Sequence, residues 1–398
     1  MKYPLLTNAF SQEDILEGIK IIKSKQITMS KKTKEFEKKF SSYVKSKYAL
    51  MVNSGSSANL LAIALLCNPL RKNKLKPGDE VIIPVLCWST SLWPIIQYGL
   101  KPKFVDINLK NLNIDIEKLE RSITKKTKAI FCVHVLGLSS NMNKIKRLAK
   151  KNKLFIIEDT CESFGSKFKG KFLGTFGEVG TYSFYYSHQI TSGEGGMIVC
   201  NKKEDYEILL SMRAHGWARD RLVLKKYRQK YRNLDSRFLF INSGYNLRPT
   251  EIQAAIGLSQ FKRKEEFKKE RNNNRNKIIN KVIRNSKYNN QIYFLQTTDD
   301  IDPSWFGLAI IINNKYKNKK KKFLDLLEKK GIESRPIISG NFVNQPATKL
   351  YNLNKKNIKF PNAQFIEDHG FFIGLHTKKI DNRTLNYISS NLLKINDI

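Results

Sequence analysis

His188 is the residue of this 398-residue chain whose setting most suggests chemistry. Residues 182–186 are almost continuously aromatic and predict a buried strand, and residues 197–200 predict a second strand after a glycine-rich turn. His188 is therefore expected on a loop that rigid elements hold from both sides, a common position for functional groups. A lone histidine near glycines is more often structural, so the residues around it must decide between the two interpretations.

Two further features suggest ligand binding. Residues 48–52 predict an apolar strand that leads into a glycine and serine turn, 53–59, and then an apolar helix. Such a turn places backbone N–H groups and the positive end of a helix at one point, so it can bind an anion. Asp159 ends the apolar segment 154–158, where an unpaired carboxylate would be costly to bury. It is either a structural helix cap or ion-pair partner, or a partner for a bound ligand.

From residue 79 onward the pattern alternates between strands and helices. The expected strands cover residues 81–84, 104–107, 129–133 and 154–158, and the expected helices cover residues 91–98, 116–123 and 142–151. This alternation predicts an α/β fold with a mostly parallel central sheet covered by helices. Ligands of such sheets bind at the carboxyl ends of the strands, where Trp88, Asp159 and the turn after Val52 all fall.

A long helix from residue 249 toward residue 285 divides the chain into two predicted domains. A large domain covers residues 1–248, with an N-terminal helical arm, and a smaller α/β domain covers residues 249–398. The smaller domain is expected to hold strands at 306–312 and 332–337 and helices at 321–330 and 382–393. Residues 221–242 are basic and aromatic, and they predict an irregular connection or hairpin that folds over a bound nucleotide.

Composition limits the classes of function. A formal charge of +37 and a pI near 9.9 would suit a nucleic-acid binder. The lysines and arginines are scattered over every segment, however, so we expect no nucleic-acid partner and only an attraction for anionic small molecules. None of the five cysteines pairs with another at metal-ligand spacing, which predicts no metal site and a reducing compartment such as the cytoplasm. No apolar run approaches the roughly 20 residues of a membrane span.

Several segments together resemble one family. The loop 180–197, the Glu-Asp-x-x-Glu sequence at 158–162, and residues 213–220 and 244–251 are similar to the DegT/DnrJ/StrS-type sugar aminotransferases of fold-type I. Members of that family use pyridoxal 5′-phosphate and act on nucleotide-linked keto-sugars. Most of them carry lysine where this chain has His188, and the chain is most similar to a histidine-bearing branch of 3-dehydratases. The resemblance extends over nearly the whole chain.

The resemblance implies a role for each residue of a composite site. Gly55, Ser56, Ser57 and Ser183 would bind the cofactor phosphate, Trp88 would stack on the cofactor ring, Asp159 would pair with the ring nitrogen, and Asn246 would reach the cofactor phosphate of a partner subunit. His188, His215 and Glu162 would be the catalytic residues. A fold-type I architecture and a homodimer with shared active sites follow from the same resemblance.

The histidine changes the chemistry that the resemblance implies. A lysine would hold the cofactor covalently, whereas His188 cannot, so the useful form is freely bound pyridoxamine 5′-phosphate. An imidazole with an ordinary pKa of about 6.5 is a suitable general base at neutral pH. The implied reaction removes the C3 hydroxyl of a nucleotide-linked 4-keto-6-deoxy sugar in deoxysugar and lipopolysaccharide biosynthesis. The expected substrate is the GDP-linked mannose derivative, and the expected amino donor is L-glutamate.

Two alternatives remain. Gln189 stands where the dehydratases often carry a second histidine, and the pair Ser192-Gly193 is more similar to the aminotransferases. The chain could therefore be a related nucleotide-sugar enzyme with another substrate or outcome. It could also be an inactive homologue with a binding or regulatory role, although the intact cofactor residues argue against that interpretation.

Overall fold

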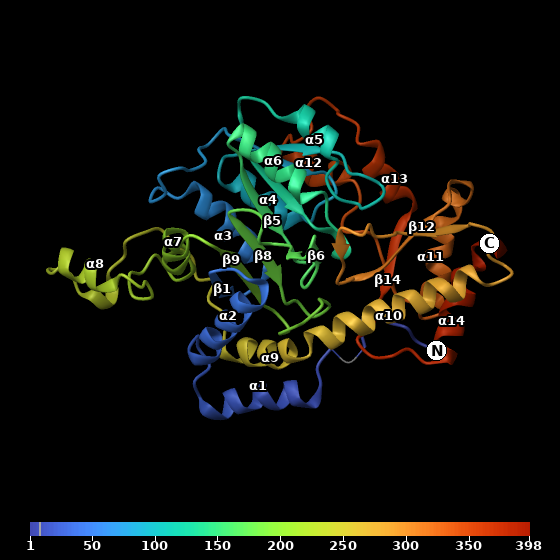
Figure 1. Cartoon of the computed structure of the whole chain (residues 1–398), viewed down its shortest axis with the longest axis horizontal. Helices are drawn as coiled ribbons and strands as arrows, with labels where there is room; N and C mark the ends of the chain where they lie inside the picture. The colour runs from blue at the N-terminus through green and yellow to red at the C-terminus, as the bar shows by residue number, and fades with distance from the viewer. Residues whose placement is uncertain (8) are drawn as a thin grey trace.

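The computed structural model describes residues 1–7 and 9–398, and its centre is a seven-stranded sheet (Figure 1). The strands lie in the order β1 (Tyr48–Val52), β9 (Gly196–Cys200), β8 (Val179–Ser183), β5 (Phe155–Asp159), β4 (Thr127–Val133), β2 (Glu80–Pro84) and β3 (Lys101–Val105). Only β9 runs antiparallel to its neighbours within this sheet. The other six strands point the same way, as predicted, and their carboxyl ends meet at one edge.

Helices surround the sheet, and most of the predicted helices are confirmed. Those before residue 250 are α1 (Gln12–Ser24), α2 (Lys31–Val44), α3 (Gly55–Cys67), α4 (Ser89–Gln97), α5 (Ile116–Ser122), α6 (Met142–Asn152), α7 (Lys203–Arg213) and α8 (Leu224–Lys230). Helix α1 begins with a capping box, in which the side chains of Ser11 and Asp14 each accept the backbone N–H of the other. Helix α3 begins at Gly55, inside the turn predicted at 53–59, because Ser54 already serves as its N-cap.

Both faces of the sheet are buried, as the alternation of side chains in β1 shows. Leu50 belongs to the main hydrophobic core together with much of α3, whereas the next residue, Met51, belongs to a second core rich in aromatic side chains. Helix α2 supplies Phe36 and Phe40 to this second core. The sheet is therefore covered on each side, which explains why its strands read as continuous apolar runs.

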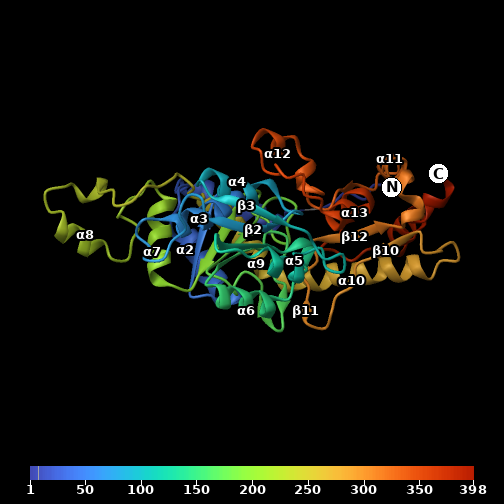
Figure 2. The same ribbon diagram turned by 90° about the horizontal axis from the view of Figure 1, so that it is seen from above.

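The C-terminal part of the chain holds a smaller, four-stranded antiparallel sheet. Its strands lie in the order β10 (Ile292–Phe294), β12 (Gly307–Ile312), β14 (Gly370–Gly374) and β13 (Ser334–Arg335). The helices after residue 250 are α9 (Glu251–Lys262), α10 (Lys264–Ile283), α11 (Lys320–Lys329), α12 (Pro346–Leu350), α13 (Pro361–His369) and α14 (Asn382–Leu392). Helix α10 runs from the large sheet to this part, beside which both ends of the chain lie (Figure 2).

The two parts share segments across the predicted domain boundary at residue 249. Helix α9 packs against α1 and α2, although it follows the boundary. Tyr3 pairs with Ile332 in a parallel bridge, although it precedes the boundary by far. The boundary therefore stays a prediction.

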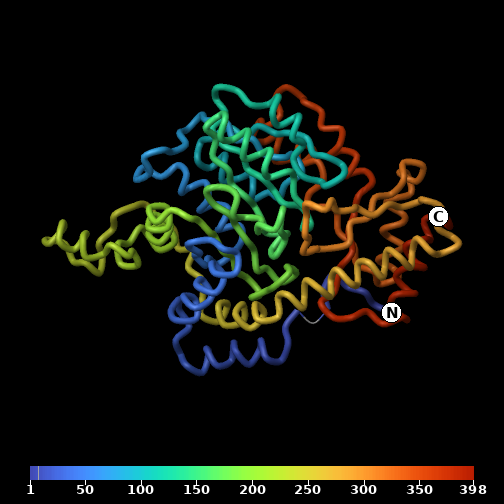
Figure 3. The backbone as a smooth tube through the Cα atoms, in the orientation of Figure 1, coloured from blue at the N-terminus to red at the C-terminus, as the bar shows by residue number. Residues whose placement is uncertain are grey.

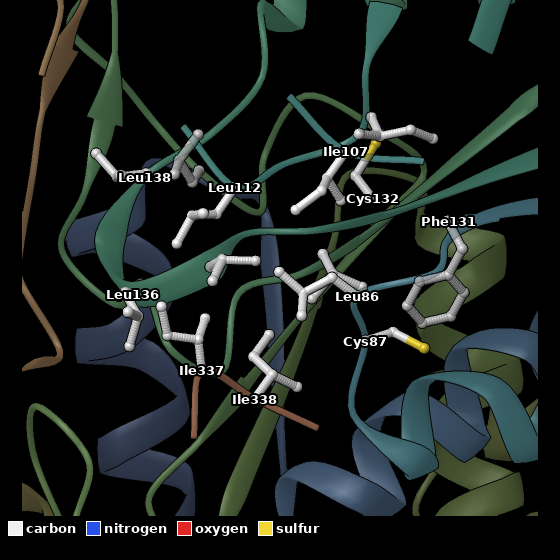
Figure 4. Packing of buried hydrophobic residues seen from close by; sticks show 14 of the residues in the cluster. Leu86, Cys87, Ile107, Leu112, Phe131, Cys132, Leu136, Leu138, Ile337 and Ile338 are labelled. Carbon is white, nitrogen blue, oxygen red and sulfur yellow. The ribbon is translucent and has the colours of Figure 1, made fainter. Parts of the chain in front are cut away.

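A loop after β13 packs the C-terminal part onto the large sheet. Ile337 and Ile338 belong to the same buried cluster as Leu86 (Figure 4). The hydroxyl of Ser339 donates to the carbonyl oxygen of Cys87 at 2.7 Å. Residues just before this loop are thereby held close to the carboxyl edge of the large sheet.

Several predicted boundaries differ from the structure. Strand β8 ends at Ser183, and Tyr185 and Tyr186 are exposed loop residues, because the chain turns and Ser183 Oγ accepts the Tyr185 N–H at 3.2 Å. The single long helix is two helices, which meet at Arg263, where the backbone leaves the helical region. The strand predicted at 332–337 is reduced to the two residues of β13.

Residues 221–242 also differ from the prediction. They contain α8 and a short 3-10 helix, Ser236–Phe238, and they extend away from the rest of the molecule (Figures 1 and 3). Several of their apolar side chains, including Leu234 and Phe238, are exposed. The segment therefore does not fold over a site within its own chain.

The described part of the chain has no helix that is both long enough and apolar enough to cross a membrane. Within the same residues, no three histidine, cysteine, aspartate or glutamate side chains gather where they could hold a metal ion. The cysteines Cys67, Cys87, Cys132, Cys161 and Cys200 are all free thiols.

Candidate active site

A cavity of about 570 Å³ opens at the carboxyl edge of the large sheet. One side of its wall comes from the C-terminal part of the chain, with Phe306, Arg335, Pro336, Ile338, Phe372 and Gly374. Seven of the ten predicted site residues line this cavity, namely Gly55, Ser56, Trp88, Asp159, Glu162, Ser183 and His188. The sheet topology therefore brings together residues that are up to 133 positions apart in the sequence, counting from Gly55 to His188.

The turn before α3 has the form of a phosphate cradle. Ser54, Gly55 and Ser56 line the cavity at the helix N-terminus, where free backbone N–H groups favour an anion. A Cβ atom on Gly55 would lie 2.5 Å from the Cβ of Ser183, so only glycine lets the turn lie this close to β8. Ser57 does not line the cavity, and its N–H donates to Ser54 Oγ at 3.1 Å as part of the helix cap. The residues present fit a phosphate bound between the turn and the Ser183 hydroxyl.

The described hydrogen-bond donors to the Asp159 carboxylate are all neutral groups. Asn59 Nδ2 and Ser91 Oγ donate to its Oδ2 at 2.8 and 2.7 Å, and the Cys161 N–H donates to its Oδ1 at 3.1 Å. The Thr181 hydroxyl donates to Asn59 Oδ1 at 2.6 Å, which turns the amide nitrogen toward the carboxylate. Asp159 is 4% exposed and makes no ion pair with any residue that the structure describes. The arrangement suits a cationic ligand group, such as a protonated ring nitrogen.

Trp88 and Glu162 form other parts of the wall. The Trp88 side chain, at the N-cap of α4, is 56% exposed, so a large flat apolar surface is open to a ligand. Glu162 Oε2 accepts the Leu136 N–H at 3.0 Å. Burial raises the pKa of Glu162 to about 7, and the nearby negative charge of Asp159 contributes to the rise. Glu162 can therefore exchange a proton close to neutral pH.

The imidazole of His188 lies between two aromatic edges. Its ring centroid is 5.9 Å from that of Tyr185 and 5.1 Å from that of Phe306, and both rings are nearly perpendicular to it. Burial, with a smaller effect from the positive charge of Arg271, lowers the pKa of His188 to about 3. The imidazole is therefore neutral at pH 7, but it is a weaker base than the ordinary imidazole that the sequence analysis assumed.

The first seven residues complete the wall on the side of the C-terminal part. Leu5 lines the cavity, and His376 holds the segment that carries it. The Thr7 hydroxyl lies 2.7 Å from His376 Nδ1, and the carbonyl oxygen of Pro4 lies 2.8 Å from His376 Nε2. The ring of Tyr3 stacks on the same imidazole with the centroids 4.2 Å apart. His376, for which the sequence analysis predicted no role, thus holds one wall of the cavity in place.

His215 and Asn246 lie outside the cavity of their own chain. An antiparallel bridge between Ala214 and Asn246 places the two predicted residues next to each other. His215 packs against Trp217 with the ring centroids 4.7 Å apart, and the exposed Asn246 accepts a hydrogen bond from Arg248 Nε at 2.9 Å. A catalytic or cofactor role for either residue therefore requires a second subunit, and both roles stay predictions.

Comparison with known proteins decides the family. The chain matches the DegT/DnrJ/EryC1/StrS aminotransferase family over residues 9–392. It belongs to that family. The GDP-4-keto-6-deoxy-D-mannose 3-dehydratase of Yersinia pseudotuberculosis is 38% identical to it over 398 residues, which cover 99% of this chain and 98% of the relative.

Solved structures of similar enzymes share the whole fold. A mutant GDP-4-keto-6-deoxymannose 3-dehydratase with bound GDP-perosamine has a TM-score of 0.86 and 36% identity, covering 98% of this chain and 100% of its own. A structure under the same enzyme name, with a trapped PLP–glutamate geminal diamine, has the same TM-score, identity and coverage. The predicted family and fold class are therefore confirmed.

Within this DegT/DnrJ/EryC1/StrS member, Gln189 does not face the cavity. Its amide nitrogen donates to the carbonyl oxygens of Glu162 and Ser304, at 2.6 and 3.2 Å. These bonds tie the His188 loop to two neighbouring segments. Gln189 therefore supports the loop that carries His188 and does not itself line the cavity.

The polar residues of the wall that the sequence analysis did not single out include Asn59, His134, Glu194 and Arg335. Asn59 is a polar residue four positions after Gly55 in an otherwise apolar helix, which was a usable signal. His134 directly follows β4, so the strand-end argument that selected Trp88 would also have found it. Glu194 offered no signal, because nothing local shows which side of a glycine-rich turn faces a cavity.

Proposed function

We propose that this chain is a pyridoxal-phosphate-dependent 3-dehydratase that acts on GDP-4-keto-6-deoxymannose. The observation that carries the proposal is the neutral imidazole of His188 in a cavity whose described wall contains no lysine. The similarity over 99% of the chain to an enzyme of that name supports the substrate.

The wall residues have distinct tasks in binding. When bound in its amine form, the cofactor supplies an amine that can combine with the sugar ketone and a ring that withdraws electrons. The Gly55 turn and the Ser183 hydroxyl bind its phosphate. Asp159 keeps its ring nitrogen protonated, and the open face of Trp88 covers the ring. All four groups are held before the ligand arrives, so binding requires little rearrangement.

His188 and Glu162 have the properties that the proton transfers require. His188 takes the proton from C4′ of the cofactor, and the electrons released expel the C3 hydroxyl of the sugar. Glu162 lies on the same wall with a pKa of about 7, so it can supply the proton with which that hydroxyl leaves as water. Hydrolysis then yields ammonia and a 3-deoxy-4-keto sugar, and L-glutamate restores the cofactor amine by giving up its amino group and leaving as 2-oxoglutarate. The structure with a PLP–glutamate adduct in an enzyme of this name supports glutamate as the donor.

The location and pathway follow from the same proposal. Free thiols at all five cysteines are typical of a reducing compartment, so we place the enzyme in the cytoplasm. Its product would enter the deoxysugar part of lipopolysaccharide biosynthesis.

Ammonia release tests the reaction. The protein is incubated with pyridoxal 5′-phosphate, L-glutamate and GDP-4-keto-6-deoxymannose, and a His188→Asn variant is compared with His369→Asn, the same change outside the cavity. We expect His188→Asn to lower ammonia release by about 10²- to 10⁴-fold, as for the loss of a general base, while cofactor affinity stays normal. Near-normal release by this variant would contradict the role of His188. Wild-type activity only with another nucleotide-linked sugar would contradict the substrate.

We also propose a homodimer in which Asn246 and His215 complete the partner's cavity. Both residues lie outside their own cavity, and Phe240, which pairs with the neighbouring Trp217, is an exposed aromatic residue that a partner would cover. Mixing an Asn246→Ala protein with a His188→Asn protein gives mixed dimers with one intact site. We expect partial activity to return after subunit exchange. Verified mixed dimers without activity would show that Asn246 works within its own chain.

A further inference from the structure

Arg271 of α10 carries a buried positive charge that no carboxylate neutralises. Its side chain is 2% exposed and is the largest fully buried side chain among the described residues. No aspartate or glutamate oxygen within that part of the chain forms an ion pair with it, and its Nε has no hydrogen-bond partner there. An uncompensated buried charge is costly, so a protein that keeps one is expected to use it.

The guanidinium contacts the two backbone segments that enclose the His188 imidazole. Its Nη2 donates to the carbonyl oxygen of His188 itself, and its Nη1 donates to the carbonyl oxygen of Trp305, each at 3.3 Å. Trp305 precedes Phe306, whose ring meets the imidazole edge-on. One planar cation therefore connects the loop that presents His188 to the segment that supplies its aromatic wall.

The imidazole has little other support. Its Nδ1 is buried, and no residue that the structure describes offers it a hydrogen bond. The rings of Tyr185 and Phe306 limit its movement, but aromatic edges fix a position less strictly than hydrogen bonds do. The backbone under His188 must therefore be rigid if the imidazole is to stay within reach of a reacting atom.

We propose that Arg271 is a positioning residue that sets the location of the His188 imidazole by bridging the carbonyl groups of His188 and Trp305. The kinetic consequence rests on the proposed dehydratase function, whereas the positioning itself does not. A displacement of about 1 Å at a reacting group can cost on the order of 10²-fold in rate.

The positive charge of Arg271 supports the same role as its hydrogen bonds. It favours the neutral form of His188, as burial does, and so lowers the pKa of that residue. The cavity wall that includes His188 also carries the charged groups Asp159, Glu162, Glu194 and Arg335. Arg271 is the charged side chain that favours the neutral form of this base.

Arg275 provides a matched control. It lies one helical turn further along α10, is also buried, and also makes no ion pair with a described residue. Its guanidinium stacks over the ring of Trp305 at 4.1 Å and donates to the carbonyl oxygen of Leu295, but it makes no hydrogen bond to His188. A general effect of removing a buried arginine from this helix should appear in both variants, and a positioning effect only at Arg271.

The test combines NMR with kinetics for Arg271→Met, Arg271→Lys and Arg275→Met in the full chain. Histidine labelled with ¹³C at Cε1 gives one ring signal for each of the five histidines, and His188→Asn identifies the signal of His188. We expect Arg271→Met to shift or broaden the His188 signal at pH 7, because the imidazole leaves its place between the two aromatic rings. Arg271→Lys keeps the charge but cannot bridge both carbonyl groups, so it should also change this signal. Arg275→Met should not.

The kinetic arm uses ammonia release with the GDP-linked sugar. We expect kcat to fall on the order of 10²-fold in both Arg271 variants, while KM and the affinity for pyridoxal 5′-phosphate stay within about twofold of wild type. An unchanged His188 signal in Arg271→Lys would overturn the proposal, and so would equal changes of that signal in Arg271→Met and Arg275→Met. Each of these outcomes needs only one of the two Arg271 variants to fold. A changed signal in a protein whose wild type releases no ammonia would instead overturn the proposed function and leave the positioning role intact.

Discussion

Replacing Gly55 with alanine tests the phosphate cradle with a single methyl group. The added Cβ would lie 2.5 Å from Ser183 Cβ, 2.9 Å from Ser183 Oγ and 3.0 Å from Cys161 Sγ. Carbon atoms in contact are normally about 3.5–4.0 Å apart, so the overlap with Ser183 Cβ is about 1 Å or more. Neither residue can move freely, because Gly55 begins α3 and Ser183 ends β8. Overpacking of this kind costs about 1–3 kcal/mol.

The misfit separates the two groups that would hold the cofactor phosphate. At 1.4 kcal/mol for each factor of ten, we expect the affinity for pyridoxal 5′-phosphate to fall by about 5- to 150-fold. The affinity is measured by equilibrium dialysis, and pyridoxal, which lacks the phosphate, serves as a second ligand. The substitution should reduce the affinity for pyridoxal less than the affinity for pyridoxal 5′-phosphate. The matched control is Gly18→Ala in α1, whose Cβ would make only an ordinary contact of 3.4 Å with Ile256 Cδ1. A folded Gly55→Ala protein with wild-type affinity, or an equal loss for both ligands, would refute the placement of the phosphate at this turn.

Three further predictions follow from the cavity wall. Borohydride added with pyridoxal 5′-phosphate should leave no reduced adduct on any cavity residue in peptide mass spectra, because no lysine is among the lining residues described. A reduced adduct on a cavity residue would contradict non-covalent binding of the cofactor. Because burial raises the pKa of Glu162 from 4.5 to about 7, the folded state binds this proton more tightly than the unfolded state, and stability is lost as pH rises through that window. As the pH rises from 4.5 to 8, the free energy of unfolding of Glu162→Gln should therefore increase by up to about 3 kcal/mol relative to that of wild type, measured by urea unfolding of the free protein. A difference in unfolding free energy that stays constant with pH would contradict the raised pKa. His376→Leu removes two hydrogen bonds that hold the Leu5 segment, together worth about 1–3 kcal/mol. The KM for the sugar should therefore rise about fivefold or more without a change in cofactor affinity. An unchanged KM would show that this segment does not contact the sugar.

The sequence by itself determined the features that depend on neighbouring residues. It predicted β1 and the turn before α3 because hydrophobic period, glycine and capping residues lie within a few positions of one another. It also predicted that Asp159 and Trp88 belong to one site, because the carboxyl ends of parallel strands meet at one edge whatever the details of packing. Family resemblance then linked His188 to these residues, and the cavity contains all three.

The tertiary structure decided everything that depends on contacts between distant residues. Leu5, Arg335 and His376 take part in the cavity only because the C-terminal sheet docks against the large sheet. Whether His215 faces its own cavity depends on the path of residues 213–248, which no local pattern encodes. The low pKa of His188, the raised pKa of Glu162 and the uncompensated charge of Arg271 have the same origin. Desolvation and electrostatic coupling are set by every atom that packs around a group, and most of those atoms come from elsewhere in the chain.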